Sequence, residues 1–276
     1  MTFELRGVSV RHTASAAGPA ALQDLTLSIA QGEQLALIGP SGAGKTTLLH
    51  TLACAHRPDA GQFTLFGDAP WAAGDVRRRA LRARLFLAPQ TPPLPPRQRV
   101  VTAVLAGRLP HWSLWQALAS LVKPADPEAA YAALARFNLQ DKLYARVDRL
   151  SGGERQRCSM ARLLVSRAEA FLVDEPLSAL DPALAVQALT VLQEEASARK
   201  ATLVCSLHQV ELARTYFPRI VGLRDGRIVF DAPREQVTDE MIQALYRNAR
   251  EELDDAPTVG FLTDMGTPAV AVPRCF

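Results

Sequence analysis

The chain has 276 residues, and 31 Lys and Arg against 28 Asp and Glu give it a formal net charge of only +3. Hydrophobic residues make up 48% and charged residues 21%, which is the composition of an ordinary globular protein with room for one large domain or two smaller ones. A nearly neutral chain of this kind is neither a wholly basic nucleic-acid coat nor an acidic disordered protein.

The first third of the chain predicts several strands and one helix. We expect an edge strand at 3–10 and a half-buried strand at 22–29, where apolar and polar residues alternate. The apolar stretch 34–38 ends in glycine and predicts a buried strand, followed by a helix from 45 to about 55. Residues 61–66 predict one further strand.

The middle of the chain, from about 92 to 149, predicts a mostly helical insert. It opens with four prolines within five residues, which exclude regular structure there. Stretches rich in Ala and Leu follow, such as 127–137, and these favour helices.

The last third predicts strands that alternate with helices. Strands are expected at 170–173, 201–206, 220–223 and 227–231, and helices at 183–198 and 209–216. Asp225-Gly226 is typical of a tight turn between the last two strands. Strands alternating with helices indicate a parallel sheet of the α/β class. The final residues, 249–276, show little periodicity and predict a tail or a loosely docked extension, and a regulatory role for it stays open.

Neither the N-terminal residues nor the cysteines predict export. Glu4 and Arg6 interrupt any apolar segment of a secretory signal, and no apolar run reaches 18 residues. The four cysteines are scattered without a Cys-x-x-Cys pair: Cys54, Cys158, Cys205 and Cys275. We therefore expect reduced thiols, with no zinc site and no disulfide framework.

The segment GPSGAGKTT at 39–47 predicts a phosphate-binding loop. It fits the pattern G-x-x-x-x-G-K-[ST] and stands between a predicted strand and a predicted helix. Backbone N–H groups of such a loop bind phosphate, Lys45 reaches the β and γ phosphates, and Thr46 places a hydroxyl on Mg²⁺. The loop consists of Gly39, Pro40, Ser41, Gly42, Ala43, Gly44, Lys45, Thr46 and Thr47. The alternative is a glycine-rich turn with an exposed lysine.

Two carboxylates and a histidine follow buried strands. AFLVDEP at 170–176 delivers Asp174 and Glu175 to the carboxyl edge of the sheet, where ligands bind in α/β folds. Asp174 is a candidate Mg²⁺ ligand, through water, and Glu175 a candidate general base. His208 follows the next strand and could link phosphate to water. The alternatives are surface acids and a structural histidine, and we assign structural roles to His50, His56 and His111.

LSGGERQR at 150–157 predicts a second phosphate contact. Ser151 and Glu154 form a capping box that starts a helix, and Gly152 and Gly153 leave the first N–H groups uncovered. A plain helix cap is the alternative. Because one chain does not need two γ-phosphate sites, these residues favour a dimer in which Ser151 faces the ATP of the other chain.

These motifs, together with Gln90 and SALD at 178–181, follow one another in the order found in ABC-transporter ATPases, which the chain resembles over about residues 3–247. The resemblance implies an α/β fold: a P-loop NTPase (RecA-like) core with an N-terminal antiparallel β subdomain and an inserted α-helical subdomain. The expected ABC ATPase domain spans 1–248, with the core at about 1–90 and 165–248, the helical subdomain at about 91–164, and the tail at 249–276.

The resemblance also assigns roles to single residues. It implies a head-to-tail dimer that sandwiches two ATP molecules with Mg²⁺. Ser151 and Gly153 then contact the opposite γ-phosphate, and Asp181 lies in the dimer interface. Gln90 senses Mg²⁺ and the attacking water, and begins a loop that moves with the membrane partner. His12 stands where members usually place an aromatic residue against adenine.

A narrower resemblance concerns VLAGRL (104–109), SLHQVELAR (206–214) and GLRDGRIVFDAP (222–233), which are similar to ATPases of phosphonate importers. It implies a peripheral subunit on the cytoplasmic face of a bacterial inner membrane. Its partners are a separate permease and, indirectly, an extracytoplasmic solute-binding protein, for phosphonate or a related small anion. The alternatives are another solute, or a soluble ABC-type ATPase that acts on nucleic acid. A single phosphate loop, a single LSGGE and an insert of ordinary size disfavour the last.

The positive charge is concentrated in one segment. Residues 76–125 contain no Asp or Glu and nine basic residues: Arg77, Arg78, Arg79, Arg82, Arg84, Arg97, Arg99, Arg108 and Lys123. This basic segment therefore carries +9 and the rest of the chain −6. It surrounds Gln90, on the side that the resemblance turns toward the permease. It is either a docking face for acidic permease loops or anionic lipid headgroups, or a solvated arginine face.

Overall fold

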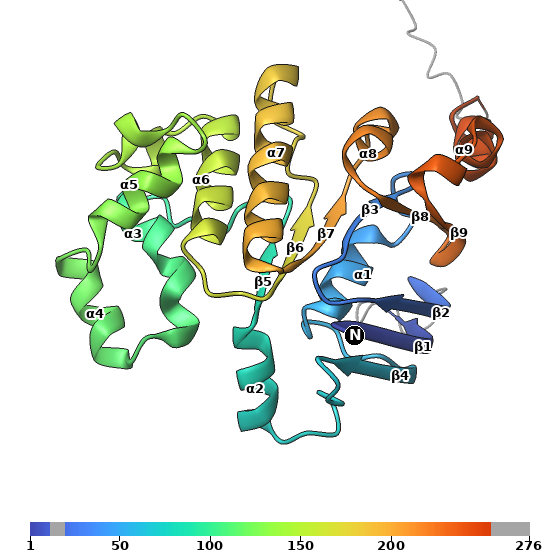
Figure 1. Ribbon diagram of the computed structural model, residues 1–276, viewed down its shortest axis with the longest axis horizontal. Coiled ribbons are helices and arrows are strands. Elements are labelled where there is room, and N and C mark those ends of the chain that lie inside the picture. Colours follow the sequence, from blue (N-terminus) through green and yellow to red (C-terminus); the bar gives the residue numbers. More distant parts are fainter. Residues whose placement is uncertain (12–19, 255–276) are drawn as a thin grey trace, which may run out of the picture.

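The computed structural model describes residues 1–11 and 20–254, with side chains up to Arg247. His12, Cys275 and most of the predicted tail lie outside these residues. The described chain forms a three-stranded sheet in the order β2-β1-β4 and a six-stranded sheet in the order β5-β6-β7-β3-β8-β9 (Figure 1). The structure is of the predicted α/β class.

The smaller sheet is antiparallel throughout. Strand β1 (Phe3–Val10) pairs on one side with β2 (Leu22–Ile29) and on the other with β4 (Ala60–Leu65). The prediction that β1 is an edge strand is therefore wrong, because it is the central strand. Its second partner returns only after helix α1 (Lys45–Leu52), and such a non-local pairing leaves no mark on the periodicity of β1 itself.

The larger sheet has a parallel interior, as predicted. Its strands are β5 (Leu85–Ala88), β6 (Ala170–Asp174), β7 (Thr202–Ser206), β3 (Gln34–Ile38), β8 (Arg219–Arg224) and β9 (Arg227–Pro233). The first five are parallel, and β9 pairs antiparallel with β8 across the Asp225-Gly226 turn. Strands β6 and β7 are buried along their whole length, which explains their continuous apolar sequences.

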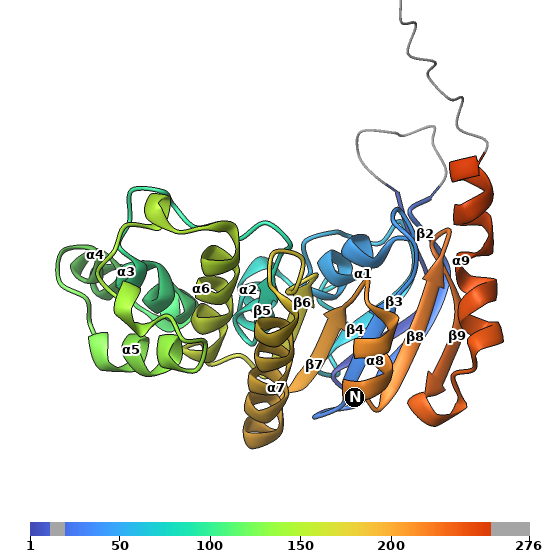
Figure 2. The same ribbon diagram turned by 90° about the horizontal axis from the view of Figure 1, so that it is seen from above.

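Helices cover the larger sheet and form a separate group at one end. Helices α3 (Val100–Leu105), α4 (Leu114–Val122) and α5 (Pro127–Ala135) gather at the left end of the molecule in Figure 1, and α6 (Gly152–Leu164) lies between them and the sheet. Helices α7 (Pro182–Arg199) and α8 (Val210–Tyr216) lie nearer the strands. Figure 2 places α9 (Asp239–Asp254) at the opposite end of the molecule from α4. The four prolines lie outside helices and strands, as predicted, whereas the proposed subdomain boundaries stay a prediction.

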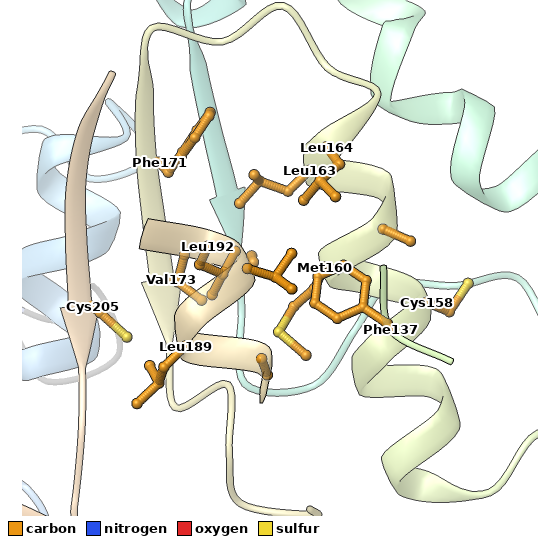
Figure 3. Packing of buried hydrophobic residues seen from close by; sticks show 14 of the residues in the cluster. Phe137, Cys158, Met160, Leu163, Leu164, Phe171, Val173, Leu189, Leu192 and Cys205 are labelled. Carbon is orange, nitrogen blue, oxygen red and sulfur yellow. The ribbon is translucent and has the colours of Figure 1, made fainter. Parts of the chain in front are cut away.

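Two hydrophobic clusters hold these parts together. Along β3, Ala36 and Ile38 belong to one cluster and Leu35 and Leu37 to the other, so the strand is apolar on both faces. The first cluster joins α3, α5, α6 and α7 to the sheet, and Figure 3 shows Met160 of α6 near Val173 of β6. The second lies between α1, the antiparallel sheet and the other face of the larger sheet. The helical group and the sheet therefore share one continuous core.

Three elements were not predicted from the sequence. Helix α2 (Asp75–Ala83) buries only Leu81, so it lacks the apolar repeat of a packed helix. Strand β5 has only four residues. Helix α9 was not predicted, and it continues to Asp254, six residues into the predicted tail or extension at 249–276. Adding a residue to an existing helix costs far less than starting one, so a helix can continue past its apolar positions. No helix in the described part of the chain has the length and apolarity needed to cross a membrane.

Candidate functional site

The phosphate-binding loop connects β3 to α1, as predicted. Gly44 precedes the first residue of α1 and has a φ of 99°, in the region that favours glycine. A Cβ at this position would lie 2.7 Å from the carbonyl oxygen of Ala21. The backbone of the loop therefore requires glycine here, for both its conformation and its close packing.

Lys45 lies inside the loop and is buried. Its Nζ donates hydrogen bonds to the carbonyl oxygens of Gly39 at 2.7 Å and Pro40 at 3.0 Å. Burial lowers the pKa of Lys45, and the nearby carboxylates of Glu175 and Asp174 oppose this shift. The loop thus carries a desolvated cation at its centre, close to the two acids at the carboxyl end of β6.

The ends of β6 and β7 form a buried polar relay. Asp174 is only 1% exposed, and its Oδ1 accepts a hydrogen bond from Ser206 Oγ at 2.5 Å. The same hydroxyl accepts a hydrogen bond from the Glu175 N–H at 2.9 Å. Glu175 has a φ of 48°, which is unusual for a residue other than glycine. The relay holds the strained Glu175 backbone against the buried acid.

The Glu175 carboxylate joins two other predicted site residues. Its Oε2 accepts a hydrogen bond from Gln90 Nε2 at 2.6 Å, and its Oε1 lies 2.5 Å from His208 Nε2. The Glu175 side chain is only 11% exposed, whereas that of His208 is 49% exposed. Residues that are far apart in the sequence therefore converge at the carboxyl edge of the sheet, as predicted.

These residues line one cavity of about 270 Å³. Its walls are formed by Ala21, Ser41, Gly42, Ala43, Gly44, Lys45, Thr46, Thr47, Gln90, Glu175 and His208. Asp174 does not line the cavity but lies buried beside it.

No cluster of three His, Cys, Asp or Glu side chains suited to a metal occurs among the described residues. Mg²⁺ needs only one or two protein oxygen ligands beside phosphate, and the exposed Thr46 hydroxyl and the Asp174 carboxylate fit that requirement.

The LSGGERQR segment forms the predicted capping box. Ser151 Oγ accepts a hydrogen bond from the Glu154 N–H at 3.2 Å, and Glu154 Oε2 accepts one from the Ser151 N–H at 2.8 Å. That second bond lowers the pKa of the Glu154 carboxyl. Ser151 and Gly152 are exposed, and neither they nor Gly153 line the cavity.

Gly153 lets the start of α6 approach the loop that follows Glu175. A Cβ on Gly153 would lie 2.6 Å from the carbonyl oxygen of Ala179. Asp181, two residues further on, caps α7 by accepting a hydrogen bond from the Leu184 N–H at 3.0 Å. Asp181 is exposed and lies outside the cavity lining.

Two residues of the site were not assigned from the sequence. Gln156 Nε2 donates a hydrogen bond to the Glu175 carbonyl oxygen at 2.8 Å, which ties α6 to the acidic edge. Ser206 forms the relay described above. Gln156 belongs to LSGGERQR and Ser206 ends a buried strand, but only the fold brings either of them to Glu175. The rings of His50 and His56 lie 5.2 Å apart and neither lines the cavity.

Comparisons with known proteins identify relatives over the whole chain. A family model described as ABC transporter matches residues 22–178. The chain is 56% identical, over the full length of both chains, to "Phosphonates import ATP-binding protein PhnC 2" of Albidiferax ferrireducens. It is 51% identical, again over both full lengths, to "Phosphonates import ATP-binding protein PhnC 1" of Pseudomonas aeruginosa. A solved dimeric bacterial ABC transporter cassette is 24% identical and superposes with a TM-score of 0.72, covering 84% of this chain and 98% of that one, which supports the fold.

Proposed function

The chain belongs to the ABC transporter family, and from that premise we propose that it powers the import of a phosphonate or a related small anion through a separate permease. It is an ABC-type transport ATPase, converting ATP and water to ADP and phosphate. The observation that carries the solute class is the 56% identity, over both full lengths, to a phosphonates import ATP-binding protein.

ATP binds with its phosphates in the loop at 39–47. The backbone N–H groups of the loop hold the phosphate oxygens, and Lys45 exchanges its two loop carbonyls for the β and γ phosphates. Thr46, Asp174 and Gln90 would hold Mg²⁺, and the ion would offset the negative charge of the phosphates. The adenine contact stays a prediction from the sequence, because its candidate, His12, lies outside the described residues.

Glu175 acts as the general base. One carboxylate oxygen accepts the proton of the attacking water, while Gln90 orients that water and His208 links Glu175 to the γ-phosphate. The strained Glu175 backbone, held by Ser206 and Gln156, keeps the carboxylate in the cavity. Catalysis consists mainly of positioning and charge stabilisation.

A second copy of the chain completes each site. Ser151, Gly152 and Gly153 present a helix N-terminus that does not line the cavity of their own chain. In a head-to-tail dimer they contact the γ-phosphate bound to the partner, with Asp181 in the interface. The dimer closes around two ATP molecules and pulls on the permease. The assembly lies on the cytoplasmic face of the bacterial inner membrane, and an extracytoplasmic protein delivers the solute to the permease from the other side.

Replacing Glu175 with Gln tests the ATPase mechanism. We expect kcat to fall by a factor of about 10²–10⁴, the usual contribution of a general base, while ATP binding persists and a dimer accumulates with ATP and Mg²⁺. Size-exclusion chromatography and phosphate release measure both effects. The exposed Glu211→Gln, in the first turn of α8, is the matched control. Hydrolysis at the parental rate in Glu175→Gln would contradict the assigned role.

Transport assays test the solute. Cells that lack their own system and carry this chain with its permease should take up a phosphonate, and the Glu175→Gln version should not. Competition with phosphate and phosphite ranks the anions. Uptake of an unrelated solute, or salt-sensitive nucleic-acid binding without a permease partner, would refute the proposed import function.

A further inference from the structure

Helix α4 turns its apolar face outward, which is the reverse of a normal surface helix. Its large apolar side chains are exposed: Leu114 (76%), Trp115 (82%), Leu118 (49%), Leu121 (58%) and Val122 (90%). The one buried residue of the helix is Ser120. The hydroxyl of Ser120 has no hydrogen-bond partner among the described residues. A surface helix ordinarily packs its apolar stripe against the core and leaves its polar stripe in water.

The exposed residues form one continuous face. Position 118 is four residues from 114, three from 121 and four from 122, and such spacings place side chains on the same side of a helix. The helix is well capped, because Gln116 and Ser113 exchange hydrogen bonds of 2.9 and 3.3 Å at its start. The apolar face is therefore presented by a defined helix.

The surroundings of this face are basic. The segment 76–125 contains no acidic residue, and Lys123 follows the last residue of α4. In Figure 1, α4 lies at the left end of the molecule and α2, with its arginines, at its lower edge. On α2, Arg79 and Arg82 are exposed and form no ion pair among the described residues. Charge of this sign complements anionic lipid headgroups.

We propose that α4 is a membrane-surface anchor that lies in the interface of an anionic bilayer. Leu114, Trp115, Leu118, Leu121 and Val122 insert below the headgroups, while Lys123 and the α2 arginines contact lipid phosphate. Amphipathic helices with Trp and Leu on one face and basic residues beside them bind membranes in this way. This inference rests on the proposed peripheral location but not on the ATPase chemistry.

The apolar face of α4 does not belong to the nearby groove next to α2. A groove of about 870 Å³ separates α2 from the segment 109–112, and Arg78, Arg79, Arg82 and Trp112 are among its lining residues. No residue of α4 lines it. The apolar side chains of α4 are therefore exposed outside the groove, as insertion into a lipid surface requires.

Co-sedimentation of the full chain with vesicles, in the absence of permease, tests the proposal. Vesicles of phosphatidylglycerol and phosphatidylethanolamine are compared with phosphatidylcholine vesicles at low and high salt. We expect binding to the anionic vesicles that weakens with salt, and a loss of about tenfold in the variant Leu118→Glu/Leu121→Glu. Tyr131→Glu, which charges an exposed aromatic residue on α5, is the matched control and should bind normally.

Two further measurements separate this proposal from its alternatives. Brominated lipids should quench the fluorescence of the wild-type chain, and Trp115→Phe should remove most of that quenching. The Leu118→Glu/Leu121→Glu variant should hydrolyse ATP at the parental rate, so a failure of the ATPase assignment would be seen independently. Equal vesicle binding by all variants, or no binding at any salt concentration, would overturn the proposal. So would binding of α4 to detergent-solubilised permease without lipid, since that would make the face a protein interface.

Discussion

Replacing Ser206 with Ala should uncouple the strained backbone of Glu175 from the buried acid beneath it. The Ser206 hydroxyl is fully buried, donates to Asp174 Oδ1 and accepts from the Glu175 N–H, at 2.5 and 2.9 Å. Alanine fits the same space but offers neither bond. The Glu175 N–H then loses this partner, and Asp174 loses its donor.

The expected size of the effect follows from these two losses. Leaving a buried polar group unpaired costs about 1–3 kcal/mol. For a chain of this size each kcal/mol lowers the midpoint of thermal unfolding by about 2–4 °C, so a loss of about 2 kcal/mol corresponds to a fall of about 6 °C. Because Glu175 has a φ of 48°, its backbone can relax once the hydrogen bond is gone. The carboxylate then moves away from Gln90 and His208, and kcat should fall by about tenfold or more with little change in the KM for ATP.

Thermal unfolding monitored by circular dichroism and steady-state phosphate release measure the two effects. Ser120→Ala is the matched control, because the Ser120 hydroxyl is also buried but makes no hydrogen bond among the described residues. Removing it should leave stability unchanged or slightly higher. If Ser206→Ala unfolded at the parental temperature and hydrolysed ATP at the parental rate, the relay would have no role in positioning Glu175.

Three further predictions concern the loop, its contact with α9, and the buried thiols. Gly44→Ala places a Cβ 2.7 Å from a backbone oxygen at a φ of 99°, so we expect equilibrium dialysis to find ATP binding weakened by at least about tenfold. Tyr246 of α9 accepts a hydrogen bond from the Gly39 N–H at 3.2 Å, so Tyr246→Phe should raise the KM for ATP by a few-fold without unfolding the protein; an unchanged KM would show that α9 does not support the loop. Burial raises the pKa of Cys54 to about 11 and of Cys158 to about 12, so at pH 8 both should react with a thiol reagent only after denaturation. Rapid labelling of either cysteine in the native protein, read by mass spectrometry, would contradict their burial.

Much of the site was predictable because its chemistry is local in sequence. A glycine-rich loop after an apolar strand, acids at the end of a buried strand, and a serine three residues before a glutamate each predict their own backbone conformation. The structure has the loop between β3 and α1, Glu175 at the end of β6, and the capping box at Ser151. In each case the determining interactions span only a few residues.

The parts that were not predictable depend on distant contacts. The place of β1 in its sheet is decided by β4, and the role of Gln156 by the position of α6 beside Glu175. Helix α2 buries a single side chain, so no apolar repeat distinguished it from a polar loop. Periodicity records which side chains are buried, but it does not record which strand or helix covers them.

The effective charge of the basic segment at 76–125 also depends on contacts with residues outside the segment, which the sequence does not show. Four of its nine cations pair with acids outside the segment: Arg77 with Asp68, Arg78 with Asp75, Arg84 with Glu169 and Arg108 with Asp126. Among the described residues the other five form no ion pair: Arg79, Arg82, Arg97, Arg99 and Lys123. A count of charge along the sequence therefore overstates the field that a docking partner meets. These five cations, rather than the whole +9, set the attraction of this face for acidic groups, and because all five are exposed, salt weakens that attraction.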